Sequence, residues 1–429
     1  MKRFLIICFL FILAFSARSI VIVNDNKAIE ADEVEYDRLA MNLLAGKGYI
    51  NSGDGSATSL RPPLYAILLM VVYELFGHSY FIVKLLQAMI GSVTVCMIYL
   101  IAEKIFTDKT ALLAGIFSSF YMTFVACAKF LYTETLAAFL LVLITYFIIT
   151  IEKPSISRAS LLGFLCGFLT LLRSESFFIP FIAVGYIALK TPRRITLLKK
   201  IIMSFALSAC FIILLIPWTV RNYKAYGKFV MVSTNAGLNM YQAIRPVDGR
   251  IFGLGPRDEI ANMANAIANE ADRSHFFIKE ALNIYKRYPL NAFRLLIMRF
   301  LFFWNIIDWE ILGGAIINYH FLFILPFAIG GAIYSFKDRK EILLISLLIL
   351  YFSSLVMVFQ GTPRYRMPID GFIIILGSYG IYKFIEYQRR LTVAVSCMGA
   401  YFIFTYLLYK YSFHTKYLIK NLMETIGLW

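Results

Sequence analysis

The residues with the clearest capacity for chemistry form an acidic cluster at residues 30–37, with the sequence Glu-Ala-Asp-Glu-Val-Glu-Tyr-Asp. The chain is otherwise basic, with 42 Lys and Arg against 26 Asp and Glu, and 60% of its residues are hydrophobic. Most of the chain must therefore lie in lipid, where carboxylates are costly. Acids gathered at a membrane surface suit the binding of a cation, the transfer of a proton or the stabilisation of a positively charged transition state.

Asp32 and Glu33 are the candidate catalytic acids of this cluster. Asp32 directly precedes an amphipathic segment, and Glu35 follows three positions later, which is the spacing of a capping box. Capping therefore explains Asp32 and Glu35 as well as catalysis does, but it explains neither Glu33 nor Glu30. Both interpretations remain open from the sequence.

Glu134 is a third candidate acid, because it begins an apolar segment between Thr133 and Thr135 with no basic residue beside it. An acid in that position costs a few kcal/mol unless it faces protein or water. Arg173 and Glu175 share one short turn, where they either pair with each other or join a site.

Four arginines on separated segments suggest a phosphate site: Arg61, Arg221, Arg364 and Arg366. The planar guanidinium group binds phosphate oxygens well, although arginines at these positions also suit the membrane interface. We expect the four to converge on one phosphate. A carboxylate beside such a site could deprotonate a hydroxyl while the phosphate leaves.

Apolar segments close to the ~20 residues needed to cross a bilayer recur along the chain. The clear ones are residues 5–23, 82–105, 130–151, 201–220, 321–336, 342–359, 371–385 and 391–409, and shorter ones are 111–125, 161–172 and 176–189. We expect an all-α polytopic membrane protein of about 11 to 13 transmembrane helices. The first segment also fits a signal peptide, but apolar sequence resumes at residues 20–23, which favours a retained helix.

The positions of Lys and Arg give an orientation. Short basic connections, among them residues 103–109, 190–200 and 337–340, belong in the cytoplasm by the positive-inside rule. Every candidate site residue then falls on the outer face. Residues 295–307 must not complete a crossing if 337–340 is inside.

Two outer segments are large enough to hold structure of their own. Tyr36, Leu39, Ala40, Leu43 and Leu44 have helical spacing and predict an amphipathic helix that ends at Gly46 and Gly48. Residues 229–232 and 238–242 flank a turn-like Thr-Asn-Ala-Gly and predict a short hairpin, followed by a helix from near Pro256 to about Tyr288. The expected organisation is 1–220, a transmembrane module with a catalytic first outer loop at 24–62; 221–294, an outer loop with hairpin and helix; and 295–429, further transmembrane helices.

The order of these pieces resembles the GT-C class of membrane glycosyltransferases, in particular the protein mannosyltransferases (glycosyltransferase family 39) and the lipid A aminoarabinose transferase. The resemblance covers most of the chain. It rests on Asp32-Glu33-x-x-Tyr36 with the following Leu-Ala-x-Asn-Leu-Leu-Ala-Gly-Lys-Gly-Tyr49, Arg61-Pro-Pro-Leu-Tyr65, Tyr132-Thr-Glu134-Thr, Leu172-Arg173-Ser-Glu175, Pro217-Trp-Thr-Val-Arg221-Asn222 and Arg364-Tyr365-Arg366-x-Pro368.

The resemblance implies a GT-C-like helical bundle that takes a sugar from a polyprenyl-phosphate donor at the outer face of the cytoplasmic membrane. It implies Asp32 as catalytic base with Glu33 beside it, and Glu134 as a supporting acid. The expected substrate-binding residues are Tyr36, Arg61, Tyr65, Arg173, Arg221, Arg364, Tyr365 and Arg366. The chain has no match for the metal-binding Glu and His of the aminoarabinose transferase, so a divalent cation stays open.

The expected partners are the lipid donor, the bilayer and an acceptor that is a lipid, a glycan or a protein, with no nucleic acid. A flippase for lipid-linked sugars, or another transporter, is the alternative. Such a protein should show inverted repeats, central helices broken by Gly or Pro, and charges in mid-bilayer. Here the charges lie at the ends of the apolar segments, which favours glycosyl transfer.

Overall fold

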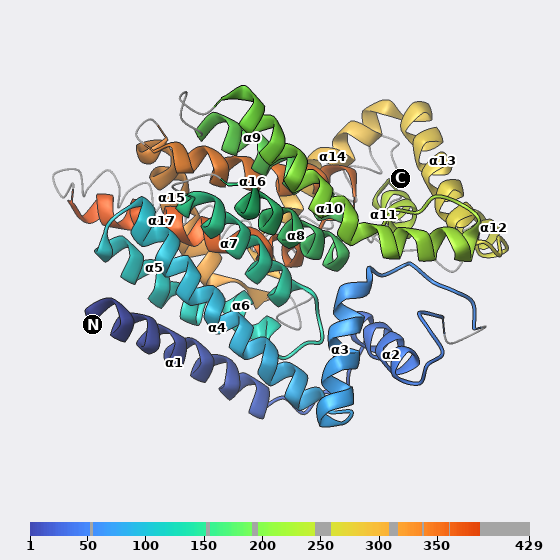
Figure 1. Cartoon of the computed structure of the whole chain (residues 1–429), viewed down its shortest axis with the longest axis horizontal. Helices are drawn as coiled ribbons and strands as arrows, with labels where there is room; N and C mark the ends of the chain where they lie inside the picture. The colour runs from blue at the N-terminus through green and yellow to red at the C-terminus, as the bar shows by residue number, and fades with distance from the viewer. Residues whose placement is uncertain are drawn as a thin grey trace, which may run out of the picture.

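The computed structural model describes residues 1–51, 55–151, 155–190, 196–244, 259–308, 316–336, 339–359 and 361–386, and these are almost entirely helical (Figure 1). The expected all-α membrane architecture is confirmed. Five described segments are long and apolar enough to cross a membrane: α1 (Lys2–Val23), α4 (Tyr80–Ile105), α10 (Leu197–Tyr226), α16 (Lys340–Val358) and η2 with α17 (Pro363–Arg366 and Met367–Glu386).

Five shorter apolar helical segments also belong to the described part of the bundle. They are α3 (Pro63–Phe76), α7 (Glu134–Thr150), α8 (Ile156–Leu172), η1 with the start of α9 (Ser174–Phe178 and Ile179–Lys190) and α15 (Tyr319–Ser335). The span predicted at 111–125 is two helices, α5 (Asp108–Phe120) and α6 (Met122–Cys127), which meet at Tyr121. The span predicted at 391–409 lies outside the described residues.

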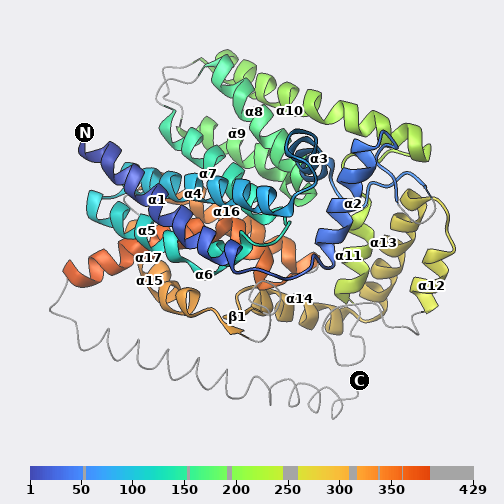
Figure 2. The ribbon, with the colours of Figure 1, turned by 90° about the horizontal axis from the view of Figure 1, so that it is seen from below.

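The segments predicted to be outside the membrane gather at one end of the bundle. This end, on the right of Figure 1, carries α2 (Asp32–Leu44), α11 (Asn235–Ile244), α12 (Glu259–Asn265) and α13 (Glu270–Arg287). Figure 2 shows the same helices together at that end from a second direction. The N-terminal end of α7 and the C-terminal end of α8 point towards it, so residues far apart in the sequence meet there.

The segment at 295–307 leads back into the bundle without a separate long helix. Its first part lies in α14 (Pro289–Phe303), which packs against α13, α16 and η2, and its last residue begins β1 (Ile307–Asp308). A short antiparallel ladder follows, formed by β1 and β2 (Ile316–Ile317), and α15 then begins.

The hairpin predicted within 229–242 is wrong, because residues 235–244 form the helix α11. Tyr241 of α11 is fully buried and packs on Phe277 of α13, with ring centroids 5.2 Å apart. This helical burial outweighs the turn signal of Thr-Asn-Ala-Gly. The long helix predicted to Tyr288 is also divided: Asn269 caps α13 by accepting the N–H groups of Ala271 and Asp272, and Pro256 lies outside the described residues.

The amphipathic helix is confirmed as α2. Its buried side chains include Tyr36, Leu39 and Ala40, at the spacing expected for one helix face. Gly46 and Gly48 follow with φ of 70° and 86°, a left-handed conformation that glycine adopts without strain.

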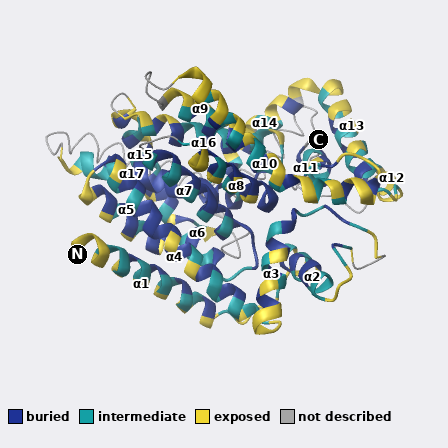
Figure 3. Ribbon diagram, viewed as in Figure 1, coloured by how far each residue is buried: buried dark blue, intermediate teal, exposed yellow. Residues whose placement is uncertain are grey.

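Close contacts between helices hold the buried core, which is dark blue through the centre of Figure 3. The tightest described approach joins α15 and α17. A Cβ atom at Gly331 would lie 2.0 Å from Leu376 O, and one at Gly380 would lie 2.0 Å from Phe327 O. Glycine is therefore required at both positions for the two backbones to touch.

We predict that Gly331→Ala forces α15 and α17 apart and destabilises the protein by about 1–3 kcal/mol. The neighbouring Gly330 gives a matched control, since a Cβ there meets nothing within 4 Å. Gly330→Ala should be neutral or stabilising by up to ~1 kcal/mol, because alanine favours helix. Thermal melting of both variants in detergent measures the difference; equal melting temperatures would show that the backbones are not in contact.

Candidate functional site

A cavity of about 430 Å³ opens where the outer segments meet the bundle. Its walls come from α2, the start of α7, the end of α8, η1, residues 229–236, α11, α13, the end of α16 and η2. Of the predicted site residues, the cavity is lined by Asp32, Tyr36, Arg61, Glu134, Arg173, Arg364 and Tyr365.

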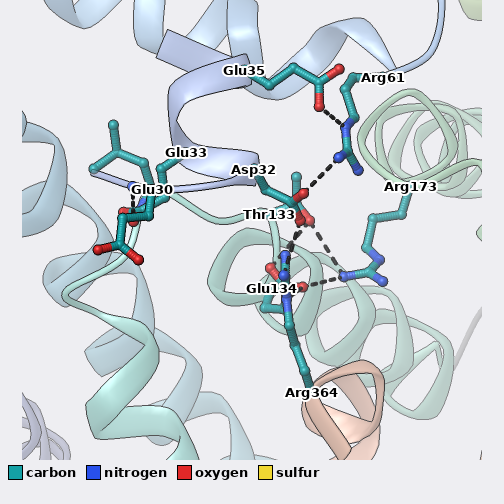
Figure 4. A network of polar contacts seen from close by, with 10 residues as sticks. Glu30, Asp32, Glu33, Glu35, Arg61, Thr133, Glu134, Arg173 and Arg364 are labelled. Carbon is teal, nitrogen blue, oxygen red and sulfur yellow. Dashed lines mark hydrogen bonds and ion pairs between the residues drawn. The ribbon is translucent and has the colours of Figure 1, made fainter. Parts of the chain in front are cut away.

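Asp32 lies between two guanidinium groups (Figure 4). Its Oδ1 is 2.6 Å from Arg61 Nη2, and its Oδ2 is 3.0 Å from Arg364 Nη1. Arg61 also donates from Nε to Glu35 Oε2 at 2.8 Å. Asp32 is the first residue of α2, Ala31 is the N-cap, and no side chain caps the helix, so the capping-box interpretation is wrong.

Glu134 is fully buried and is bound by two arginines from other segments. Its Oε1 accepts from Arg364 Nε at 2.5 Å and lies 3.0 Å from Arg173 Nη1. Arg173 also pairs with Glu175, at 2.5 Å from Nε to Oε1. The ion-pair cluster therefore runs without a break through Glu35, Arg61, Asp32, Arg364, Glu134, Arg173 and Glu175.

Aromatic rings fix the planes of these guanidinium groups. Arg364 lies 3.7 Å from the ring centroid of Tyr132, and Arg173 lies 5.1 Å from that of Tyr365. Stacking of this kind adds a cation–π attraction to the ion pairs. Burial lowers the pKa of Arg61, but Tyr36, Asp32 and Glu35 raise it by more, so the pKa lies above its usual value and the group stays charged.

Glu33 does not face the cavity, although it is next to Asp32. Its side chain points away from the ion-pair cluster in Figure 4 and accepts the N–H groups of Leu131 at 2.8 Å and Glu30 at 3.2 Å. Burial raises the pKa of Glu33, while these two hydrogen bonds lower it by less. Consecutive helical side chains point in different directions, so adjacency to Asp32 did not place Glu33 in the site. Its contacts tie the start of α2 to the segment before α7.

The predicted convergence of Arg61, Arg221, Arg364 and Arg366 is wrong for two of the four. Arg221 donates to the backbone oxygens of Thr58, at 2.7 Å, and of Tyr49, because this loop passes beside the end of α10. It therefore holds the loop.

Arg366 is 1% exposed and faces the bundle interior instead of the cavity. It pairs with Asp370 at 3.0 Å and donates to Phe303 O at 2.8 Å. Side chains two positions apart in a helical turn do not share a face, which separates Arg366 from Arg364. Tyr65 lies beneath the cavity, where its hydroxyl donates to Gln87 Oε1 at 2.9 Å and its ring meets the ring of Tyr36.

Sequence reasoning missed the part of the cavity formed by α11 and α13. Asn235, Asn239 and His275 line it there. The i, i+4 spacing of the two asparagines is a helical signal, but the turn-like Thr-Asn-Ala-Gly concealed it. The cavity also has an apolar part, which is lined by Phe177, Phe178, Phe229, Met231, Ile278, Phe352, Leu355, Val356 and Phe359.

The carboxylates at the cavity are bound to guanidinium groups, and they do not form the set of ligands that a metal ion needs. Within the described ranges, no three side chains of His, Cys, Asp and Glu come together as metal ligands would. The described residues at the cavity therefore do not offer a set of ligands for a metal ion.

Comparisons with known proteins show which family and which folds this chain is similar to. Residues 60–220 match the family described as dolichyl-phosphate-mannose-protein mannosyltransferase. The match confirms the resemblance to the protein mannosyltransferases over this stretch. The matched stretch holds Arg61, Glu134 and Arg173, and it ends just before Arg221. No curated protein sequence matches the chain.

Solved structures show the fold. The archaeal oligosaccharyltransferase AglB from Archaeoglobus fulgidus, with an inhibitory peptide and a dolichol-phosphate, superposes with a TM-score of 0.56 at 10% identity, over 97% of this chain and 55% of that one. The A. fulgidus oligosaccharyltransferase with Zn and sulfate gives 0.54 at 13% identity, over 94% and 52%. ArnT from Cupriavidus metallidurans bound to undecaprenyl phosphate gives 0.40 at 14% identity, over 88% and 77%.

These two A. fulgidus matches show that the chain shares their fold, as expected for a GT-C-like helical bundle. The chain spans about half the length of the archaeal oligosaccharyltransferases that it matches.

We predict that Arg364 and Glu134 are strongly coupled in stability. Arg364→Met leaves a fully buried carboxylate with Arg173 as its remaining guanidinium partner, which should cost about 3–5 kcal/mol. Adding Glu134→Gln removes the charge that needed a partner, so the double variant should lose less than the sum of the two single variants. Thermal melting in detergent measures this cycle.

The exposed pair of Lys228 and Asp272 is the control. Asp272→Asn should cost no more than about 1 kcal/mol, because exposed ion pairs contribute little. Additive effects of Arg364→Met and Glu134→Gln would contradict the ion pair between them.

Proposed function

We propose that this protein transfers a sugar from a polyprenyl-phosphate donor to an acceptor hydroxyl. The observation that supports this most is a single cavity with paired acids and arginines in one part and an aromatic, apolar lining in another. A lipid phosphate has the same division, with an anionic head and an apolar chain. The family match and the GT-C fold support sugar transfer from a lipid-linked donor in general.

Arg61, Arg364 and Arg173 are the proposed phosphate-binding residues. All three line the cavity, and guanidinium groups bind phosphate oxygens with two parallel hydrogen bonds. The lipid chain would lie along Phe177, Phe352 and their apolar neighbours. The dolichol-phosphate of the AglB structure is a ligand of the same chemical class.

Asp32 is the proposed catalytic base. The acceptor oxygen attacks the anomeric carbon, the bond from that carbon to the phosphate oxygen breaks, and the acceptor proton passes to Asp32. One base on the side away from the leaving phosphate gives inversion, and no second acid at nucleophile distance is needed. Ion pairs with Arg61 and Arg364 position the Asp32 carboxylate at the cavity.

Glu134 is the proposed supporting residue, because it is fully buried and holds both Arg364 and Arg173. An acceptor that enters from water can reach Asp32, whose side chain is 24% exposed, more readily than Glu134. The roles of the two acids thus follow from their different burial.

The proposed location is the cytoplasmic membrane, with the cavity on the outer face. The argument is the positive-inside rule applied to the short basic connections between the apolar segments. The acceptor is a lipid, a glycan or a protein. The organisation proposed is 1–220 with the catalytic loop 24–62, the outer segment 221–294 and the region 295–429.

We predict that Asp32→Asn folds and loses transfer by about 10²- to 10⁴-fold in kcat, because asparagine can still accept a hydrogen bond from one arginine through Oδ1 but cannot take a proton. Transfer from a synthetic polyprenyl-phosphate sugar measures kcat, and thermal melting checks the fold. Glu33→Gln is the neighbouring control, and it should retain far more activity. Near-wild-type transfer by Asp32→Asn would place the base elsewhere.

We predict that Arg61→Ala and Arg364→Ala each weaken the binding of polyprenyl phosphate about tenfold or more, because a hydrogen bond to a charged group is worth about 1.5–3 kcal/mol. Native mass spectrometry of the purified protein, with the bare lipid titrated in, measures Kd. Arg38→Ala is the matched control, since Arg38 is an exposed arginine on α2. Unchanged Kd in both cavity variants would contradict the phosphate site.

A further inference from the structure

The walls of the cavity that come from α11 and α13 carry polar residues that the reaction above does not use. Asn235 and Asn239 lie one helical turn apart on α11, and His275 comes from α13. We call these three residues the neutral wall. They line the same cavity as the ion-pair cluster.

The two asparagine amides are available to a ligand. In the described part of the chain, neither side chain makes a hydrogen bond to another protein group. Each amide offers two donor hydrogens and one acceptor oxygen. Polar groups of this kind in a cavity wall are satisfied by water or by a bound molecule.

His275 adds an acceptor. Its Nδ1 lies 2.9 Å from Ala271 O, and a carbonyl oxygen only accepts, so the hydrogen is assigned to Nδ1. In the neutral ring Nε2 then carries a lone pair. The neutral wall thus combines amide donors and acceptors with one imidazole acceptor.

The wall carries no carboxylate or guanidinium group of its own. The Asp, Glu, Lys and Arg side chains that line the cavity in the described residues all belong to the ion-pair cluster. The nearby Glu270 accepts hydrogen bonds from neutral groups: Ser59 N at 2.8 Å, Thr58 Oγ1 at 2.7 Å and Thr234 Oγ1 at 2.5 Å. Glu270 therefore clips the first outer loop to α13 and does not line the cavity.

From this arrangement we infer that the neutral wall binds an uncharged, hydroxyl-rich sugar. Sugar hydroxyls donate and accept together, as amides do, and match Asn235 and Asn239. An amino sugar would bring a cation to a wall that lacks a carboxylate, and a uronic acid would bring an anion to a wall that lacks an arginine. The inference rests on the proposed sugar transfer and narrows the sugar to a neutral one.

Close packing holds the wall in place. A Cβ atom at Gly237 would lie 2.1 Å from Ser274 O, so the α11 backbone rests directly on α13. Gly237 does not itself line the cavity. The distance between the asparagines and His275 is therefore set by a contact of two backbones, which suits recognition of a small rigid ligand.

The test uses free methyl glycosides, so it does not depend on a lipid donor or on turnover. Saturation-transfer NMR of the full chain in detergent should detect methyl glucoside or methyl mannoside, and give much weaker signals for the methyl glycosides of glucosamine and glucuronate. Asn239→Ala should lower the neutral signal about threefold or more, since one hydrogen bond contributes about 0.5–1.5 kcal/mol. Asn283→Ala, on the exposed face of α13, is the matched control and should change nothing.

Asn239→Asp separates recognition from folding, because it should shift the preference towards the glucosamine glycoside while the melting temperature stays close to that of wild type. Equal signals from neutral and charged glycosides, or an unchanged neutral signal in Asn239→Ala, would overturn the inference. Either result leaves the Asp32 and Arg61 tests of sugar transfer unaffected.

Competition identifies the source of the sugar. If a glucosyl-bearing polyprenyl phosphate displaces the glycoside and bare polyprenyl phosphate does not, the wall holds the sugar of the donor. If both lipids bind together with the glycoside, the wall holds a glycan acceptor. Displacement by the bare lipid alone would show that the glycoside sits in the phosphate or chain region, which overturns the assignment to the neutral wall.

Discussion

The burial of Glu134 is the constraint on which this end of the molecule depends. Its side chain is fully buried at the start of an apolar helix, where an unpaired carboxylate would be very costly. Arg173 and Arg364 supply the compensating charges from two segments that come later in the chain. Because Arg364 also reaches Asp32, the position of the partly exposed Asp32 depends on the buried Glu134.

The start of α2 has no side-chain cap and is held by its neighbours instead. Ala31 has a φ of 48° and is the only described non-glycine residue with positive φ. Glu33 binds backbone N–H groups on one side, while Asp32 is held by arginines on the other. The first turn of α2 is thus fixed by neighbours from both sides, and this can support the strained residue before it.

Much of the architecture could be predicted from the sequence, because apolar segment length and the placement of Lys and Arg are strong signals in membrane proteins. The amphipathic α2 also followed from its spacing. The hairpin predicted within 229–242 is wrong because it relied on a four-residue turn signal. The helix α11 forms there instead, and its burial depends on contacts with α13. Tyr241 faces Phe277, and nothing in the local sequence reveals that contact.

The site was predicted only in part, again because the sequence does not reveal long-range packing. Asp32, Glu134, Arg61 and Arg364 are conspicuous as charges beside apolar segments, and the structure brings them together. Arg221 looks the same in sequence, yet it binds backbone oxygens of a loop. Which of two similar arginines reaches a cavity depends on long-range packing. Asn235 and Asn239 were not predicted as site residues, because uncharged amides are common on protein surfaces. Their place in the cavity wall is visible only in the folded structure.

The arginines at the cavity are shared, and this has a consequence for the binding of a ligand. Arg364 holds Asp32 and Glu134, and Arg61 holds Asp32 and Glu35. An anion that enters the cavity meets arginines that already hold carboxylates. A guanidinium group has five N–H donors, so one arginine can hold a carboxylate and a further anion at the same time. A ligand that contacts Arg61 or Arg364 would therefore influence Asp32, Glu35 and Glu134 together, because the shared arginines join these three acids into one unit.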